Sequence, residues 1–247
     1  MKPVALALAV LVGLTSMTQA SELQILAGGG ITGLFKVLVP QFEAASGHKL
    51  VVRFAATPEL IRMATSGEPF DLAVVPREVF KDAGARAQFT AGPTIDIARV
   101  GFGVAVRSGA PRPPIDTPEA FKQTLLQARS VAFLPQSAAG AIVMRTFDTL
   151  GIADAMKAKT RPQPTTGDIP RAVAAGEAEL GVFLLNVLAV PEVNIVGPFP
   201  APLQQEFVFT SAIAAKARDK TAAEAFVDFL KSPQAISIMR AQGMTPG

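Results

Sequence analysis

The sequence predicts an α/β protein of two lobes whose sheets are mainly parallel. Strand-like segments alternate with helix-like segments from residue 21 onward, which is typical of parallel sheets covered by helices. The chain has 247 residues, more than the roughly 100–150 of a usual single domain. Its second half also repeats an order found in the first half, in which a strand runs through a turn of small residues into a helix.

The first predicted strand and helix meet at a turn of three glycines. Residues 23–27 alternate as a strand does, Gly28, Gly29 and Gly30 follow, and Ile31 to Phe42 carries apolar residues at the helical spacing of three and four. The turn therefore lies at a helix N-terminus, where unpaired N–H groups favour an anion and glycine lets a ligand approach. A tight strand-to-helix turn without a ligand is the alternative.

The next elements of the first lobe are predicted from caps and apolar runs. Thr57 followed by Pro58 is typical of a helix N-cap and first turn, and Gly67 is typical of a helix end. A continuous apolar run before Pro76 is typical of a strand buried in a parallel sheet. These patterns predict strand 49–54, helix 57–67, strand 71–75, helix 80–88 and a strand over 95–107 that is long enough to pass between lobes.

The second lobe and the return to the first are predicted from the same patterns. Thr117 and Ser232 each precede a proline, as helix caps often do, and residues 135–140 form a turn of small residues between a strand and a helix. The expected elements are helix 117–128, strand 130–134, helix 141–150, a helix capped by residues 165–170 that ends at 176, strand 180–185, strand 206–213 crossing back, and helices 221–230 and 233–241. We therefore expect one lobe at 21–102 and 206–247 and the other at 103–205.

The N-terminus has the pattern of a secretory signal peptide. Lys2 precedes an apolar run from Val4 to Leu14, which is too short for the roughly 20 residues of a membrane span, and Ala20 suits the cleavage site. We expect residues 1–20 to be removed after Ala20, leaving a protein that begins at Ser21 and is located in the periplasm.

Composition excludes several classes of site. Hydrophobic residues make up 49% and charged residues 17% of the chain, which favours a compact, buried core over disorder. The net charge of +3 is too small and dispersed to indicate nucleic-acid binding, but it does not oppose an anionic ligand. The chain has no cysteine and no cluster of histidines at metal-ligand spacing, so we expect no disulfide, no metal site and no cofactor.

Several segments in a characteristic order resemble the periplasmic solute-binding proteins of ABC importers, specifically the molybdate-binding-like branch. They are the signal peptide, the glycine turn, residues 42–47, 67–74 and 176–181, and the tail at 229–234. The resemblance implies a two-lobe periplasmic binding protein fold with two crossing hinge strands, in which closure of the lobes clamps the ligand. It also implies delivery of a small anion to the membrane subunits of an ABC transporter. We expect a monomer.

The ligand turns depart from the pattern of molybdate binders. Those proteins typically use serine hydroxyls in the first two turns and a tyrosine from the second lobe, whereas this chain has glycines after Ala27, alanines before Thr57 and no tyrosine. The smaller side chains favour a larger organic di- or tricarboxylate, which either Arg77 or Arg99 could bind unless these are ordinary surface or hinge residues. The expected ligand-binding residues are Gly28, Gly29, Gly30, Ile31, Ala56, Thr57, Arg77, Arg99, Ser137, Ala138, Ala139, Gly140, Asp168 and Asn186.

Two other functions are weighed against binding. Some proteins of this branch are isomerases of small tricarboxylic acids, of the aconitate isomerase kind, in which a base removes a proton beside a carboxylate. No catalytic constellation is evident: His48 is expected in solvent outside the cleft, and Ser137 is expected as a helix cap or ligand donor. The carboxylates to test as a base are Asp71, Asp96, Asp168 and Glu206. The effector domain of a transcription regulator is disfavoured by the signal peptide and the missing helix-turn-helix segment.

Overall fold

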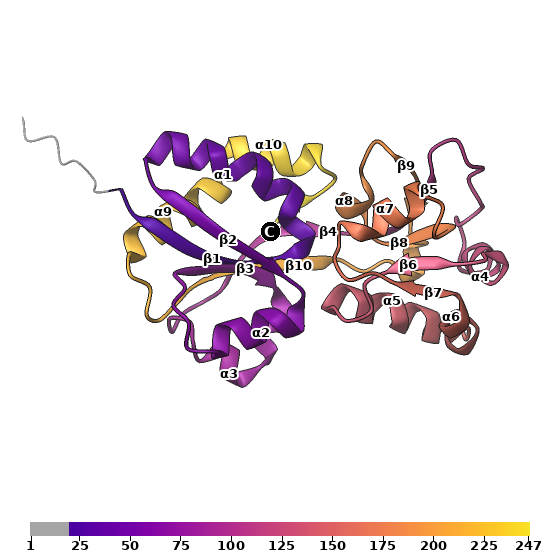
Figure 1. Ribbon diagram of the computed structural model, residues 1–247, viewed down its shortest axis with the longest axis horizontal. Coiled ribbons are helices and arrows are strands. Elements are labelled where there is room, and N and C mark those ends of the chain that lie inside the picture. The colour runs from indigo at the N-terminus through magenta and orange to yellow at the C-terminus, as the bar shows by residue number, and fades with distance from the viewer. Residues whose placement is uncertain (1–19) are drawn as a thin grey trace, which may run out of the picture.

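The computed structural model describes residues 20–247, which form two lobes side by side, each built around one sheet (Figure 1). The predicted signal peptide, apart from Ala20, lies outside the described residues. Within residues 20–247, no helix combines the length and the apolar character that crossing a membrane requires.

The first lobe contains a six-stranded sheet. Strands β1, β2 and β3 are parallel, as buried apolar strands joined through helices are expected to be. Strands β10, β4 and β11 extend the same sheet in antiparallel pairing. In the order β11-β4-β10-β3-β1-β2, the strands are Thr245–Pro246, Ile95–Val100, Phe207–Ile213, Leu72–Pro76, Glu22–Gly28 and Lys49–Ala55.

Helices cover both faces of this sheet (Figure 1). One face is covered by α1, α9 and α10, which pack on one another, and the other by α2 and α3. Asp219 and Ser232 cap α9 and α10, because each side chain accepts the N–H group three residues on. The elements are η1 (Gly29–Ile31), α1 (Thr32–Ser46), α2 (Thr57–Thr65), η2 (Arg77–Lys81), α3 (Ala83–Arg86), α9 (Lys220–Leu230) and α10 (Pro233–Ala241).

The second lobe contains a five-stranded sheet in the order β7-β6-β8-β5-β9. Strands β7, β6 and β8 are parallel, whereas β5 is antiparallel to both of its neighbours. The strands are β5 (Phe102–Arg107), β6 (Val131–Phe133), β7 (Thr160–Pro162), β8 (Leu180–Leu184) and β9 (Val193–Pro198). The helices are α4 (Pro118–Gln127), α5 (Ala138–Thr149), α6 (Ala153–Lys159), α7 (Asp168–Ala174) and α8 (Leu185–Leu188), and η3 (Ala201–Leu203) precedes the return to the first lobe.

The chain crosses between the sheets twice, as the sequence predicts. The long strand expected at 95–107 divides at Gly101, so that β4 joins the first sheet and β5 the second. The return runs between β9 and β10, and there the Gln204 side chain accepts the N–H of Phe102 and donates to its carbonyl, both at 2.9 Å. A Cβ at residue 101 would lie 3.2 Å from this side chain, so glycine lets the two crossings lie side by side.

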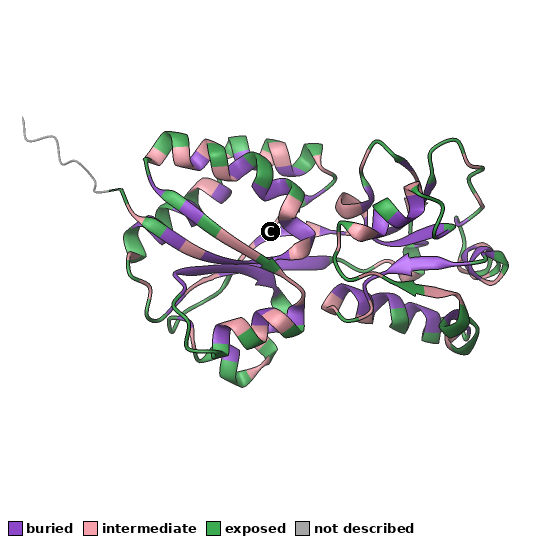
Figure 2. Cartoon of the chain, in the orientation of Figure 1, coloured by how far each residue is buried: buried purple, intermediate pink, exposed green. Residues whose placement is uncertain are grey.

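The hydrophobic core continues through the hinge. Phe102 contacts Phe207 edge-on with ring centroids 6.2 Å apart, and Phe207 contacts Phe209 in the same way at 5.3 Å. Buried residues accordingly run along the strands from one lobe into the other in Figure 2, while the outward helix faces are exposed.

Several elements differ from the sequence prediction. The sheets are mixed rather than mainly parallel, because the crossing strands return antiparallel to β3 and β8. The helix expected at 80–88 is divided at Asp82, whose extended backbone and side-chain bond to the Ala85 N–H start a new short helix. Helix α5 begins at Ala138 rather than Ala141, capped by Ser137. Helices α6 and α8 and strands β7, β9 and β11 were not predicted.

Candidate functional site

Helix N-termini from both lobes meet at the cleft. Gly28 and Ala55 are paired at the ends of the parallel strands β1 and β2, so the chain turns from both strands into η1 and α2 at one sheet edge. From the second lobe, α5 begins at Ala138, directly after the strand β6. First-turn N–H groups have no backbone acceptor within their own helix, so the three helix starts bring N–H donors toward the cleft. At α5 the Gly140 N–H is already bonded to the Ser137 hydroxyl at 2.9 Å.

Two adjoining hollows form the cleft. The narrow one has a volume of about 20 Å³ and lies against Phe207 and Phe209 of the hinge strand β10. The wide one has a volume of about 900 Å³. Residues of both lobes line both hollows, namely Gly29, Gly30, Ala55, Ala56, Leu134 and Thr166.

Three hydrogen bonds join the lobes across the cleft. The Thr166 hydroxyl donates to the Gly29 carbonyl at 3.0 Å, and the Asn186 amide donates to the Gly30 carbonyl at 2.7 Å. The Ala138 N–H donates to the Thr57 hydroxyl at 3.3 Å. The first two bonds occupy the carbonyl oxygens of the glycine turn, so N–H groups and hydroxyls dominate what remains toward the cleft. Such a surface is complementary to a negatively charged ligand.

Seven of the residues predicted from the sequence line the cleft: Gly29, Gly30, Ala56, Thr57, Ser137, Ala139 and Asn186. Thr57 is the first residue of α2 rather than its N-cap, which is Ala56, and this position turns its hydroxyl toward Ala138. Ala138 lines neither hollow but contributes its N–H to that contact.

Four predicted residues lie beside the cleft without lining it. Gly28 and Gly140 are required by packing, because a Cβ would lie 2.8 Å from Phe209 and 1.9 Å from the Leu134 carbonyl oxygen, respectively. Ile31 is a buried core residue. Asp168 accepts the Thr165 hydroxyl at 2.6 Å and pairs with Arg171, which fixes the turn before α7.

The prediction that Arg77 or Arg99 contacts the ligand has no support from their positions. Neither residue lines the cleft, and both guanidinium groups pair with Asp96. Arg99 also pairs with Glu206 at 3.4 Å, and Asp96 accepts the Thr210 hydroxyl at 2.9 Å. These ion pairs tie β4 to β10 and to the end of β3, so both arginines have a structural role at the hinge.

Two basic side chains that the sequence analysis did not select do line the cleft. Lys36 projects from the second turn of α1 and pairs with no carboxylate among residues 20–247. Arg171 pairs with Asp168 at 2.5 Å. Thr166 was expected only as part of a helix cap, although it bonds to Gly29. Lys36 lies one helical turn beyond Thr32, the first residue of α1. A basic residue at this spacing from the glycine turn is the sequence pattern that could have identified it.

The cleft contains little that resembles a catalytic centre. Glu59 is the one carboxylate that lines it within the described residues, and Arg62 binds both of its oxygens. The four carboxylates predicted as possible bases lie elsewhere in hydrogen bonds or ion pairs. Among residues 20–247, no three His, Asp or Glu side chains are grouped to hold a metal ion.

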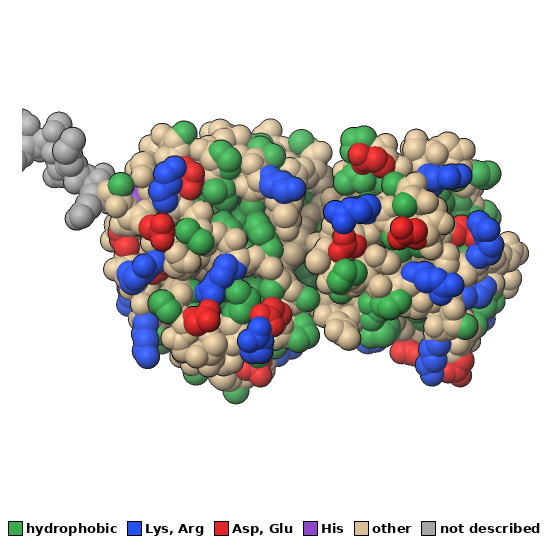
Figure 3. Space-filling view, viewed as in Figure 1, with side chains coloured by type: hydrophobic (Ala, Val, Ile, Leu, Met, Phe, Trp, Pro, Cys, Tyr) green, Lys and Arg blue, Asp and Glu red, His purple; other side chains and the backbone are tan. Residues whose placement is uncertain are grey.

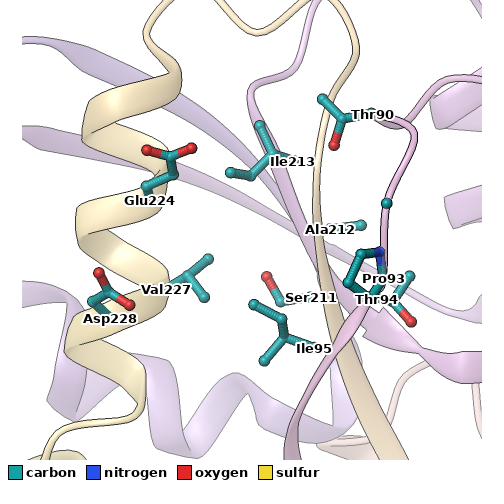
Figure 4. A pocket seen from close by; sticks show the side chains of 11 residues that line it. Thr90, Pro93, Thr94, Ile95, Ser211, Ala212, Ile213, Glu224, Val227 and Asp228 are labelled. Carbon is teal, nitrogen blue, oxygen red and sulfur yellow. The ribbon is translucent and has the colours of Figure 1, made fainter.

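A separate hollow of about 280 Å³ lies in the first lobe (Figure 4). Glu224, Val227 and Asp228 of α9 line one side, and Thr90 and residues 92–94 line the other. Its floor includes Ser211 of β10, which is 2% exposed. The Ser211 hydroxyl has no hydrogen-bond partner within the described residues. This hollow shares no lining residue with the cleft and is distinct from it.

Comparison with known proteins gives matches over nearly the whole chain. A family model described as "Bacterial extracellular solute-binding protein" matches residues 23–245. An aconitate isomerase of Pseudomonas sp. is 33% identical over 234 residues, covering 92% of this chain and 88% of the relative. Molybdate-binding protein ModA of Azotobacter vinelandii is 26% identical over 246 residues, covering 93% and 92% of the two chains.

The fold has close counterparts among solved structures. The periplasmic molybdate-binding protein of Azotobacter vinelandii superposes with a TM-score of 0.76 at 20% identity, covering 90% of this chain and 98% of that structure. At this identity the likeness establishes the two-lobe fold with its crossing strands.

Proposed function

Because this chain belongs to the family of bacterial extracellular solute-binding proteins, we propose that its cleft captures a small organic di- or tricarboxylate for delivery to an ABC importer. The observation that carries this proposal is the meeting of three helix N-termini from both lobes around one cleft. A ligand bound there contacts both lobes and so stabilises their closure. The proposed location is the periplasm, and the proposed partner is the membrane part of the transporter.

The dimensions and charge of the cleft support a carboxylate over molybdate. The wide hollow of about 900 Å³ exceeds what a small tetrahedral oxyanion fills, and no tyrosine exists to close around one. Lys36 lines the wide hollow and supplies a cation without a carboxylate partner in the described chain. Charges of both signs are interspersed over the face in Figure 3, which gives no indication of a nucleic-acid surface.

Titration calorimetry with a ligand panel tests the proposal. Tricarballylate and other tri- and dicarboxylates are expected to release heat and bind more tightly than molybdate. Protein passed over a chelating resin is expected to bind with unchanged affinity, because helix ends rather than a metal hold the anion. Tight molybdate binding without any response to carboxylates would contradict the choice of ligand, and a loss of binding after the resin would contradict the metal-free site.

The aconitate isomerase relative favours isomerisation as a second candidate function. In that reaction a base removes a proton next to a carboxylate and a proton returns to another carbon, so nothing else is consumed. The same purified protein is incubated with cis-aconitate or trans-aconitate and followed by proton NMR. A binding protein is expected to leave each isomer unchanged, whereas approach to one common mixture from both sides would identify an isomerase.

Substitution of Lys36 by methionine is expected to weaken carboxylate binding by up to about fivefold. The lysine is exposed, so its contribution lies nearer to that of a surface ion pair, about 0.2–1 kcal/mol, than to that of a buried one. Lys216→Met is the matched control, since Lys216 is also exposed and has no carboxylate partner in the described chain but lies outside the cleft. Equal affinities of the two variants in calorimetry would show that Lys36 does not contribute to ligand binding.

A further inference from the structure

Ser21, the residue before β1, is held at three points. Its N–H donates to Nδ1 of His48 at 3.1 Å, and its hydroxyl donates to Asp219. Its carbonyl accepts the N–H of Lys49 at 2.8 Å. The preceding residue, Ala20, is exposed. Ser21 is therefore fixed to the first lobe, and it is also the first residue of the mature protein predicted from the signal-peptide pattern.

His48 has a different environment from the one predicted. The sequence placed it in solvent, but its side chain is 7% exposed and stacks on Phe42 with ring centroids 6.1 Å apart. Nδ1 accepts a hydrogen bond, so this nitrogen presents a lone pair toward Ser21. The chain's only histidine is thus a fixed acceptor at the beginning of β1.

Asp219 supplies the negative charge beside Ser21. One of its oxygens caps α9 by accepting the Ala222 N–H at 2.9 Å, while the other accepts the Ser21 hydroxyl. The Ser21 hydroxyl and the cap keep the pKa of Asp219 below its usual value. Of the three basic side chains next in sequence, Lys49 pairs with Glu43 and Arg218 with Asp71, and Lys220 forms no ion pair with Asp219. No cation is therefore paired with Asp219 among residues 20–247.

We propose that His48 and Asp219 form a receptor for the α-ammonium group that export creates on Ser21. The proposal rests on the proposed export: a signal peptidase adds water across the Ala20–Ser21 peptide bond, leaving a carboxylate on Ala20 and an ammonium on Ser21. The amide nitrogen of the uncut chain donates one hydrogen bond, whereas the ammonium donates three. One of these three hydrogen bonds is still donated to Nδ1 of His48. The positive charge lies within roughly 6 Å of the Asp219 carboxylate, because the Ser21 hydroxyl already contacts that carboxylate.

The receptor joins the new terminus to two elements of the first lobe. His48 precedes β2, and Asp219 begins α9, so a charge at Ser21 ties β1 to both. Removal of the signal peptide then stabilises the lobe that carries the glycine turn, in addition to releasing the chain.

Three versions of the protein test this inference: one beginning at Ser21 with a free amine, one beginning at Ala20, and one beginning at an acetylated Ser21. Each is made by cleaving a fusion in vitro or by enzymatic acetylation. The free Ser21 protein is expected to melt about 1–3 °C above the other two, and its α-amino pKa, followed by NMR, is expected to exceed that of the Ala20 protein.

Asp219→Asn is the decisive variant, since asparagine still caps a helix but carries no charge. It is expected to abolish both differences, whereas Glu224→Gln on the same helix is expected to preserve them. Equal melting temperatures and α-amino pKa values for the free Ser21 and Ala20 proteins would overturn the proposal. Export is tested separately by the intact mass of periplasmic protein, so its failure is distinguishable from failure of the receptor.

Discussion

Replacement of Asp71 by asparagine is expected to lower the free energy of unfolding by about 1.5–3 kcal/mol, because it removes a buried charged acceptor from the N–H groups bonded to it. The Asp71 side chain is 0% exposed. It accepts the N–H groups of Gln24 at 2.7 Å and of Arg218 at 2.8 Å, and pairs with the Arg218 guanidinium at 2.9 Å. Asparagine keeps the shape but points an NH₂ group at these donors.

The same carboxylate makes stability depend on pH. Burial by itself would raise the pKa of Asp71, but the hydrogen bonds from Arg218 and Gln24 outweigh it and lower the pKa below 3.8. Because the pKa of Asp71 is lower in the folded than in the unfolded protein, the stabilisation is complete above the unfolded-state pKa. It is lost as the pH falls through the folded-state pKa. The urea concentration needed to unfold the wild type is therefore expected to fall below about pH 4. In the Asp71→Asn variant this fall is expected to be smaller.

Asp154→Asn is the matched control for both measurements. Asp154 pairs with Lys157 at 2.7 Å on an exposed helix face, and its pKa is also lowered, through the hydrogen bond from that lysine. Its replacement is expected to change stability little, as for most exposed ion pairs. If the two variants lose similar stability, Asp71 does not have the structural role assigned to it.

Replacement of Gly29 by valine is expected to weaken ligand binding at least about a hundredfold, equivalent to about 2.7 kcal/mol. Gly29 lines both hollows, and a Cβ there would lie 3.3 Å from the Thr166 hydroxyl across the cleft. Its φ angle is not positive, so valine meets no backbone penalty of that kind and acts through the space it fills. The side chain occupies the approach to the helix N-terminus and displaces Thr166 from the Gly29 carbonyl.

Calorimetry with the tightest carboxylate of the panel measures this effect, with Gly29→Ala as an intermediate step. Gly197→Ala serves as the control outside the cleft, because its φ is also not positive and a Cβ there would meet only Ile115 at 3.4 Å. Melting temperatures of all variants separate lost binding from lost folding. Unchanged affinity in a folded Gly29→Val protein would falsify the placement of the ligand at the glycine turn.

The elements that the sequence predicted best are those decided locally. Thr117 and Ser232 cap their helices as expected, because the cap and the N–H group it accepts are three residues apart. The apolar run of β3 forms a buried parallel strand for a similar reason. Short segments such as β7 and α8 were missed, since residues distant in sequence stabilise them and their own patterns are too brief to detect.

The candidate site was predictable in its backbone and not in its charges. Helix N-termini after strands are visible in sequence, which is why Gly29, Ala56 and Ser137 were selected and why they line the cleft. Arg77 and Arg99 were selected for their charge, but both pair with Asp96, whose position only the pairing of β4 with β10 determines. Lys36 was overlooked because nothing nearby in sequence marks it as lacking a carboxylate partner.

The sequence by itself determined the alternation of strands and helices, the two crossings between lobes and the turns that line the cleft, because caps, glycines and apolar periodicity act within a few residues. The tertiary structure alone decided which side chains meet across the cleft. Thr166 bonds to Gly29 and Asn186 to Gly30 over separations of 137 and 156 residues. Such contacts depend on how two sheets are placed by a hinge, and no local pattern encodes that placement.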